Sequence, residues 1–117
     1  MYLKLLSTLF VVTGFLFANG QKAAIDSLLE TTSDLYRKQP AKTINIADSA
    51  LVLSKTINYT LGIAASYLER GKGHYGSRNY SLAFEDLDKA NALFKELNDD
   101  VGQGLSLKFK GSCFERI

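Results

Sequence analysis

The sequence predicts an all-α protein built as a helix-turn-helix repeat solenoid of about two and a half repeats. Three observations support this fold class. Apolar residues recur at the three- and four-residue spacing of amphipathic helices along most of the chain. This pattern repeats with an offset of forty residues, as in proteins made of stacked helix pairs. A composition with one proline and no tryptophan, rich in alanine and leucine, also favours helix over sheet.

The first twenty residues are typical of a secretory signal peptide. Lys4 gives a positive start, residues 5–18 are uncharged and largely apolar, and Ala18-Asn19-Gly20 offers small residues at a cleavage site after Gly20. The alternative is a membrane anchor, but the apolar run is shorter than the roughly 20 residues that span a bilayer. We therefore expect an exported protein, periplasmic or extracellular, whose repeat domain covers residues 21–117 and which meets the membrane only through the signal peptide.

The repeat domain is expected to contain five helices. Proline suits the first position of a helix, so Pro40 is expected to begin the second one. Polar residues that accept from free backbone N–H groups stand before the later helices: Asn58 or Thr60, then Asn79, then Asn98-Asp99-Asp100. The expected ranges are 22–37, 40–57, 61–76, 80–97 and 101–117.

An offset of forty residues places identical residues at matching points of these helices. Arg70 and Lys110 form a similar pair at the same offset. Two helices in each period are typical of a solenoid. The identical pairs are Leu28/Leu68, Asp48/Asp88, Ala50/Ala90, Leu53/Leu93, Lys55/Lys95, Asn58/Asn98, Gly62/Gly102, Ser66/Ser106 and Gly71/Gly111.

The residues around Gly71 resemble the tetratricopeptide repeat. The resemblance rests on Leu68, Gly71 and Tyr75 in one helix, Asn79-Tyr80 at the turn, and Ala83, Leu87 and Ala90 in the next helix. Residues 87–104 look like the extended variant of exported bacterial proteins, in which such arrays commonly precede a transmembrane helix and a histidine kinase or DNA-binding output domain. The sequence departs from the family at Arg70, at His74 and at Arg78, where the turn often has glycine.

The resemblance implies two groups of site residues. The small residues that let helices approach closely would be Gly71, Ala83, Ala90 and Gly111. The first helix of each repeat would line a concave groove that mixes apolar and basic groups, which suits an extended or helical peptide of some acidic character. The alternative is that these side chains pack against the neighbouring repeat. The groove residues would be Leu28, Thr32, Tyr36, Leu68, Lys72, Tyr75, Lys108 and Ser112.

No motif of the chain predicts catalysis, a metal or another cofactor. The only histidine, His74, and the only cysteine, Cys113, have no ligand-spaced companions, and the glycines near Lys72 lack the spacing of a phosphate loop. An enzyme using His74 and Cys113 as a nucleophilic pair is the alternative, although no orienting third group is identifiable. A net charge of +2 without a basic stripe argues against nucleic acid.

We therefore expect a non-enzymatic scaffold whose partner is a protein or peptide, or further repeats or an output domain of the same protein. The alternative is the amino-terminal sensory segment of a membrane-bound signalling protein. The last helix would expose Leu105, Leu107, Phe109 and Phe114 without a covering helix, and solenoids usually end in a polar one. The repeat domain is thus expected to be incomplete at its carboxy end.

Overall fold

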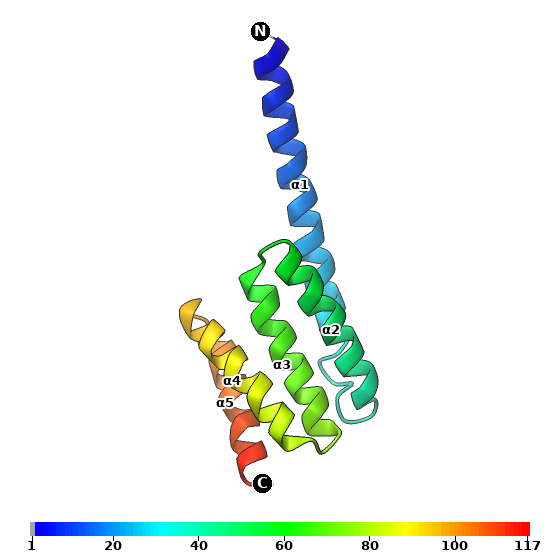
Figure 1. Ribbon diagram of the computed structural model, residues 1–117, viewed down its shortest axis with the longest axis vertical. Helices are drawn as coiled ribbons and strands as arrows, with labels where there is room; N and C mark the ends of the chain where they lie inside the picture. Colours follow the sequence, from blue (N-terminus) through cyan, green and yellow to red (C-terminus); the bar gives the residue numbers. More distant parts are fainter. Residues whose placement is uncertain (1) are drawn as a thin grey trace.

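The computed structural model describes residues 2–117, leaving out the side chains of Tyr2 and Leu3, and is all-helical over that range. Figure 1 shows α2 to α5 packed side by side, each running back along the one before it, while the first half of α1 extends away from them. The predicted all-α repeat solenoid is confirmed. Its helices are α1 Tyr2–Glu30, α2 Pro40–Thr56, α3 Thr60–Gly76, α4 Tyr80–Glu96 and α5 Asp100–Phe114.

Helix α1 differs most from the prediction, at both ends. It continues without a break through Gly20, and its large apolar side chains between Leu5 and Phe17 are exposed. None of the helices in residues 2–117 is long and apolar enough to cross a membrane.

The predicted helix end at Arg37 is wrong, because α1 stops at Glu30 and residues 31–39 form turns. The hydroxyls of Thr31 and Thr32 donate to the carbonyls of Leu28 and Leu29 at 2.6 and 2.7 Å. The backbone N–H groups of Thr32 and Ser33 also donate to carbonyls three residues earlier, at 3.1 and 3.3 Å, so the α-helical pattern ends here in tighter turns.

The connections between α2 and α3, α3 and α4, and α4 and α5 share one backbone geometry. Asn58, Arg78 and Asn98 take positive φ angles of 53°, 63° and 55°. Each donates its N–H to the carbonyl three residues earlier, and the next residue donates to the carbonyl five residues earlier, which is the Schellman way of ending a helix. The positions 58, 78 and 98 are evenly spaced, so two helix-plus-turn units give the forty-residue period.

The predicted amino-terminal caps are only partly found. Asp99 caps α5, because its carboxylate accepts the Gly102 N–H at 2.9 Å. Asn79 occupies the cap position of α4 without a side-chain hydrogen bond. Tyr59, rather than Asn58 or Thr60, stands at the cap position of α3, also without such a bond.

The forty-residue period also appears in the contacts between repeats. Arg70 Nη1 meets Asp48 Oδ1 at 2.9 Å, and Lys110 Nζ meets Asp88 Oδ1 at 2.7 Å. These are the same ion pair one period apart, joining the second helix of one repeat to the first helix of the next. The sequence pairs Asp48/Asp88 and Arg70/Lys110 thus share a physical role.

Two further repeated pairs stand at close helix contacts. The buried Ser66 and Ser106 hydroxyls donate to the carbonyls of Gly62 and Gly102 at 2.6 and 2.8 Å. A Cβ atom on Gly62 would collide with Ser54 and Tyr59, and one on Gly102 would collide with Phe94. Glycine at these positions lets α3 and α5 start close to the end of the preceding helix.

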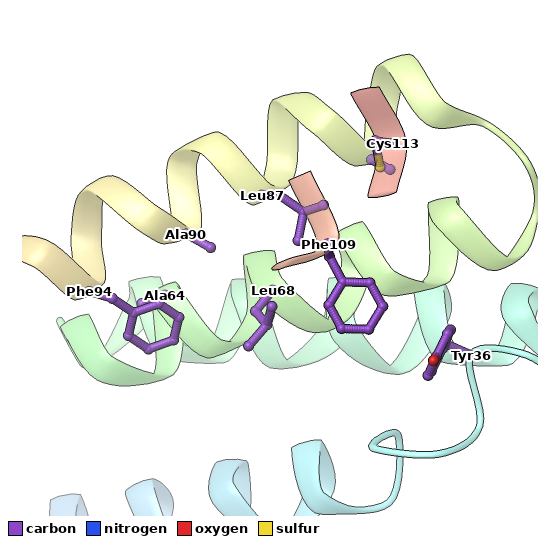
Figure 2. Packing of buried hydrophobic residues seen from close by; sticks show 9 residues of the cluster. Tyr36, Ala64, Leu68, Leu87, Ala90, Phe94, Phe109 and Cys113 are labelled. Carbon is purple, nitrogen blue, oxygen red and sulfur yellow. The ribbon is translucent and has the colours of Figure 1, made fainter. Parts of the chain in front are cut away.

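The main core lies between α3, α4 and α5 (Figure 2). Ala64 and Leu68 of α3 face Ala90 and Phe94 of α4. Helix α5 adds Phe109, which is buried rather than exposed as expected, because its ring packs edge-on against Tyr36 and Tyr75. A smaller cluster joins α1 to α2 through Ile25, Leu29 and Ala50. The main core consists of Tyr36, Ala64, Leu68, Ala83, Leu87, Ala90, Phe94, Phe109 and Cys113.

The four small residues assigned to helix packing have different surroundings. Ala83 and Ala90 are completely buried. A Cβ atom on Gly71 would lie 2.8 Å from Leu87 Cγ, so this glycine permits close approach of α3 and α4. Gly111 needs correction: it is exposed on α5, and a Cβ there would meet nothing within 4 Å in the described chain.

Candidate functional site

An open groove of about 480 Å³ runs along the faces of α1, α3 and α5. These are the first helices of successive repeats. The floor of the groove is apolar, because side chains that are three or four residues apart on α3 turn to the same side. Its apolar lining comprises Leu29, Leu61, Ala65, Leu68, Phe94, Val101 and Leu105.

The charged residues that line this groove are all acidic. They are Asp26, Glu30, Glu69 and Asp99, and no described lysine or arginine lines it. Asp26 and Glu30 are exposed, whereas Asp99 is half-buried and Glu69 is buried. The expected basic character of the groove is therefore corrected to an acidic one.

Asp26 also fixes one wall of the groove. The Tyr59 hydroxyl donates to Asp26 Oδ1 at 2.8 Å, joining α1 to the start of α3. Burial, together with this hydrogen bond and the charge of Asp26, raises the pKa of Tyr59 to about 12. The tyrosine thus stays protonated as a donor at neutral pH, and Asp26 keeps a lone pair for other partners.

Lys72, the basic residue expected at the centre of the groove, is buried in a polar network. Its Nζ donates to Ser33 O at 2.9 Å and to Glu69 Oε1 at 3.1 Å. The Thr32 hydroxyl donates to the other oxygen of Glu69 at 2.8 Å. The ammonium also lies 5.1 Å from the centre of the Tyr36 ring, within the range of a cation–π interaction. Lys72 therefore anchors the 31–39 connection to α3.

The other predicted groove residues lie in several places. Thr32 and Tyr36 belong to the 31–39 connection and are buried. Leu28 lines a separate apolar hollow of about 320 Å³ between α1 and α2. Tyr75 lines another pocket, Lys108 is exposed on α5, and the half-buried Ser112 donates its hydroxyl to the Lys108 carbonyl. Of the eight predicted residues, Leu68 alone lines the groove.

The sequence did contain a pattern that indicates the groove residues which were not predicted. Leu61 and Ala65 lie seven and three residues before Leu68, on the same helical face. Leu105 is the forty-residue equivalent of Ala65. Asp26 and Glu30 likewise lie one helical turn apart on α1, whereas Asp99 joins them only through the packing of different helices.

The environments of His74 and Cys113 disfavour the nucleophilic pair. Cys113 is completely buried, and burial raises the pKa of its thiol, which opposes thiolate formation. His74 Nε2 instead lies 3.7 Å from Asp86 Oδ2. The same Asp86 accepts two hydrogen bonds from Arg70 at 2.8 Å, so it is engaged in helix packing. Residues 2–117 also hold no group of three potential metal ligands.

We predict that His74 makes the stability of the fold depend on pH. Burial is the main cause that lowers the pKa of His74 from 6.5, with Arg70 acting in the same direction and Asp86 and Asp48 opposing it. The unfolded chain then binds the proton more readily than the folded one, so stability is lost as pH falls below about 6.5. Thermal unfolding of the wild type and His74→Gln between about pH 7.5 and pH 5.5 measures this, above the range in which carboxylates titrate. The variant is expected to lose less stability over this interval, and equal losses would contradict the assignment.

Comparisons of the chain with models of known protein families, with curated proteins and with solved structures find no match. The geometry of the groove is therefore the basis for assigning a function. It offers an apolar floor, an acidic rim and an open shape. These features suit reversible binding of another chain better than the sequestration of a reacting group.

Proposed function

We propose that the chain is a non-enzymatic repeat scaffold, akin to tetratricopeptide arrays, that binds an apolar and basic segment of another protein. The observation that carries the proposal is the groove of α1, α3 and α5, with its apolar floor and exclusively acidic charged lining. Apolar side chains of a bound segment would be buried against Leu61, Ala65 and Leu105. Its lysines or arginines would reach Glu30 and Asp26 at the rim, which favours encounter and selects the partner by charge.

We further propose that the scaffold is exported and that residues 1–20 are its signal peptide. The exposed apolar side chains between Leu5 and Phe17 support this, because they contribute nothing to the core of the repeat domain. The groove begins only beyond that stretch, at Asp26. Removal of residues 1–20 would leave every groove residue in place.

Two synthetic peptides test the proposed groove. One alternates leucine with lysine over about ten residues, and the other carries glutamate in place of lysine. Fluorescence anisotropy with the full chain should show binding of the lysine peptide that weakens as salt is added. Equal affinity for the glutamate peptide would refute the acidic groove.

The site of binding is tested by reversing one charge. Glu30→Lys is expected to lower the affinity for the lysine peptide about fivefold, since an ion pair at the rim contributes up to about 1 kcal/mol of binding free energy. The matched control is Glu85→Lys, which reverses an exposed charge on α4, a helix that supplies only Phe94 to the groove. Equal effects of both changes would show that overall charge, not the groove, determines binding.

A further inference from the structure

A second hollow, of about 300 Å³, lies at the end of the solenoid where the 31–39 connection, the α3–α4 turn and the end of α5 meet. It shares no lining residue with the groove. Its polar lining consists of three arginines and three tyrosines: Arg37, Arg78, Arg116, Tyr36, Tyr75 and Tyr80. Four of these six, all except Tyr36 and Tyr75, fall outside the residues that the sequence had marked as a binding site. We call this hollow the arginine pocket.

The three guanidinium groups of the arginine pocket have no acidic partner in the described chain. No ion pair within 4.0 Å among residues 2–117 involves Arg37, Arg78 or Arg116, and no aspartate or glutamate lines the pocket. The other arginine, Arg70, shows the contrast, because two aspartates neutralise it.

Tyrosine side chains hold two of the arginines in place. Arg37 Nε donates to the Tyr36 hydroxyl at 2.8 Å, and its guanidinium lies 5.4 Å from the centre of that ring. The Arg116 guanidinium lies 5.8 Å from the centre of the Tyr75 ring. Tyr75 in turn packs edge-on against Tyr80, with ring centres 5.7 Å apart. An ordered aromatic wall thus presents cationic hydrogen-bond donors.

The backbone at Arg78 is a separate observation that points to the same pocket. The equivalent positions of the other two turns hold Asn58 and Asn98, which tolerate the left-handed conformation, whereas arginine at φ 63° is disfavoured there. Unfavourable backbone geometry of this kind gathers at binding sites. The turn also leads into α4, whose first residue Tyr80 lines the pocket and whose first N–H groups receive no side-chain cap.

We propose that the arginine pocket binds the phosphate group of a small molecule, either inorganic phosphate or a phosphate monoester. Three positive charges match a group that carries about −1.5 to −2 at pH 7 and offers three acceptor oxygens. Each guanidinium can donate two parallel hydrogen bonds to such oxygens. A carboxylate, with one charge and two oxygens, neutralises less of the positive charge and accepts fewer of these hydrogen bonds.

Calorimetric titration of the full chain at constant ionic strength tests this proposal. The probes are inorganic phosphate, phenyl phosphate and acetate. Phosphate or phenyl phosphate is expected to bind at one saturable site, and acetate far more weakly. Binding of both phosphates assigns the site to the phosphate group alone, and binding of phenyl phosphate alone assigns it to monoesters. Equal weak binding of all three probes would overturn the proposal.

Variants locate the site and separate binding from folding. Arg37→Gln and Arg116→Gln are each expected to weaken phosphate affinity about tenfold or more, and the exposed Lys95→Gln on α4 is the matched control. Arg78→Asn is expected to weaken binding as well, while raising the unfolding temperature because asparagine suits the turn. Undiminished binding in the three arginine variants, or the same loss in Lys95→Gln, would disprove the assigned site.

Discussion

Replacing Lys72 by methionine is expected to lower the free energy of unfolding by about 3 kcal/mol. The Lys72 ammonium and the Glu69 carboxylate form a pair 3.1 Å apart, with side-chain exposures of 10% and 12%. Methionine preserves much of the aliphatic volume but leaves Glu69 buried with only the Thr32 hydroxyl as partner. Leaving a buried charge unpaired lowers stability far more than breaking an ion pair at the surface does. Chemical denaturation of the full chain, followed by circular dichroism near pH 7, measures the loss.

A double variant separates the loss of the pair from the loss of packing. Glu69→Gln combined with Lys72→Met removes both charges and keeps an acceptor for Thr32, so most of the lost stability is expected to return. Lys42→Met, an exposed change on α2, should alter stability by less than about 0.5 kcal/mol. A Lys72→Met variant no less stable than Lys42→Met would show that the network is unimportant.

This network also explains why the expected groove differs from the observed one. The helical pattern of apolar residues continues to Tyr36, so the sequence placed Thr32 and Tyr36 on a groove-lining helix. In the structure the chain turns after Glu30, and the turn brings Ser33 and Tyr36 onto Lys72. Because Lys72 binds the backbone carbonyl of Ser33, which lies in a distant turn, the contact produces no periodic pattern in the sequence. The burial of Lys72 follows from tertiary packing, which overrides the local pattern.

The features that could be predicted are those that act within one helix or recur in the next repeat. Pro40 marked the start of α2, and the forty-residue offset found pairs such as Ser66/Ser106, which make the same hydrogen bond in both repeats. The turns after α2, α3 and α4 were placed correctly, and their backbone geometry recurs as well. The arginine pocket joins residues from several elements with no shared spacing, and Asp99 reaches the acidic rim from outside α1, so only the assembled fold reveals them.

The repeat equivalence of Gly71 and Gly111 leads to a pair of opposite predictions. Gly71→Ala is expected to destabilise the chain by about 2 kcal/mol, because the new methyl would lie 2.8 Å from Leu87 Cγ and 3.3 Å from the Ala83 carbonyl oxygen. Leu87 is completely buried and has little room to yield. Gly111→Ala is expected to stabilise the chain by about 0.5–1 kcal/mol, since alanine is the better helix former and nothing lies within 4 Å.

Denaturation midpoints of the two variants, measured side by side, test whether the contact or the repeat position decides the effect. The changes are chemically identical and lie at equivalent positions of α3 and α5, so helix propensity favours alanine in both. If the two midpoints shift in opposite directions, the difference measures the stability lost when the new methyl group crowds Leu87. Gly104→Ala, a second open position on α5, should follow Gly111. Stabilisation by Gly71→Ala would show that Leu87 can move aside, and that α3 and α4 do not depend on glycine for their close approach.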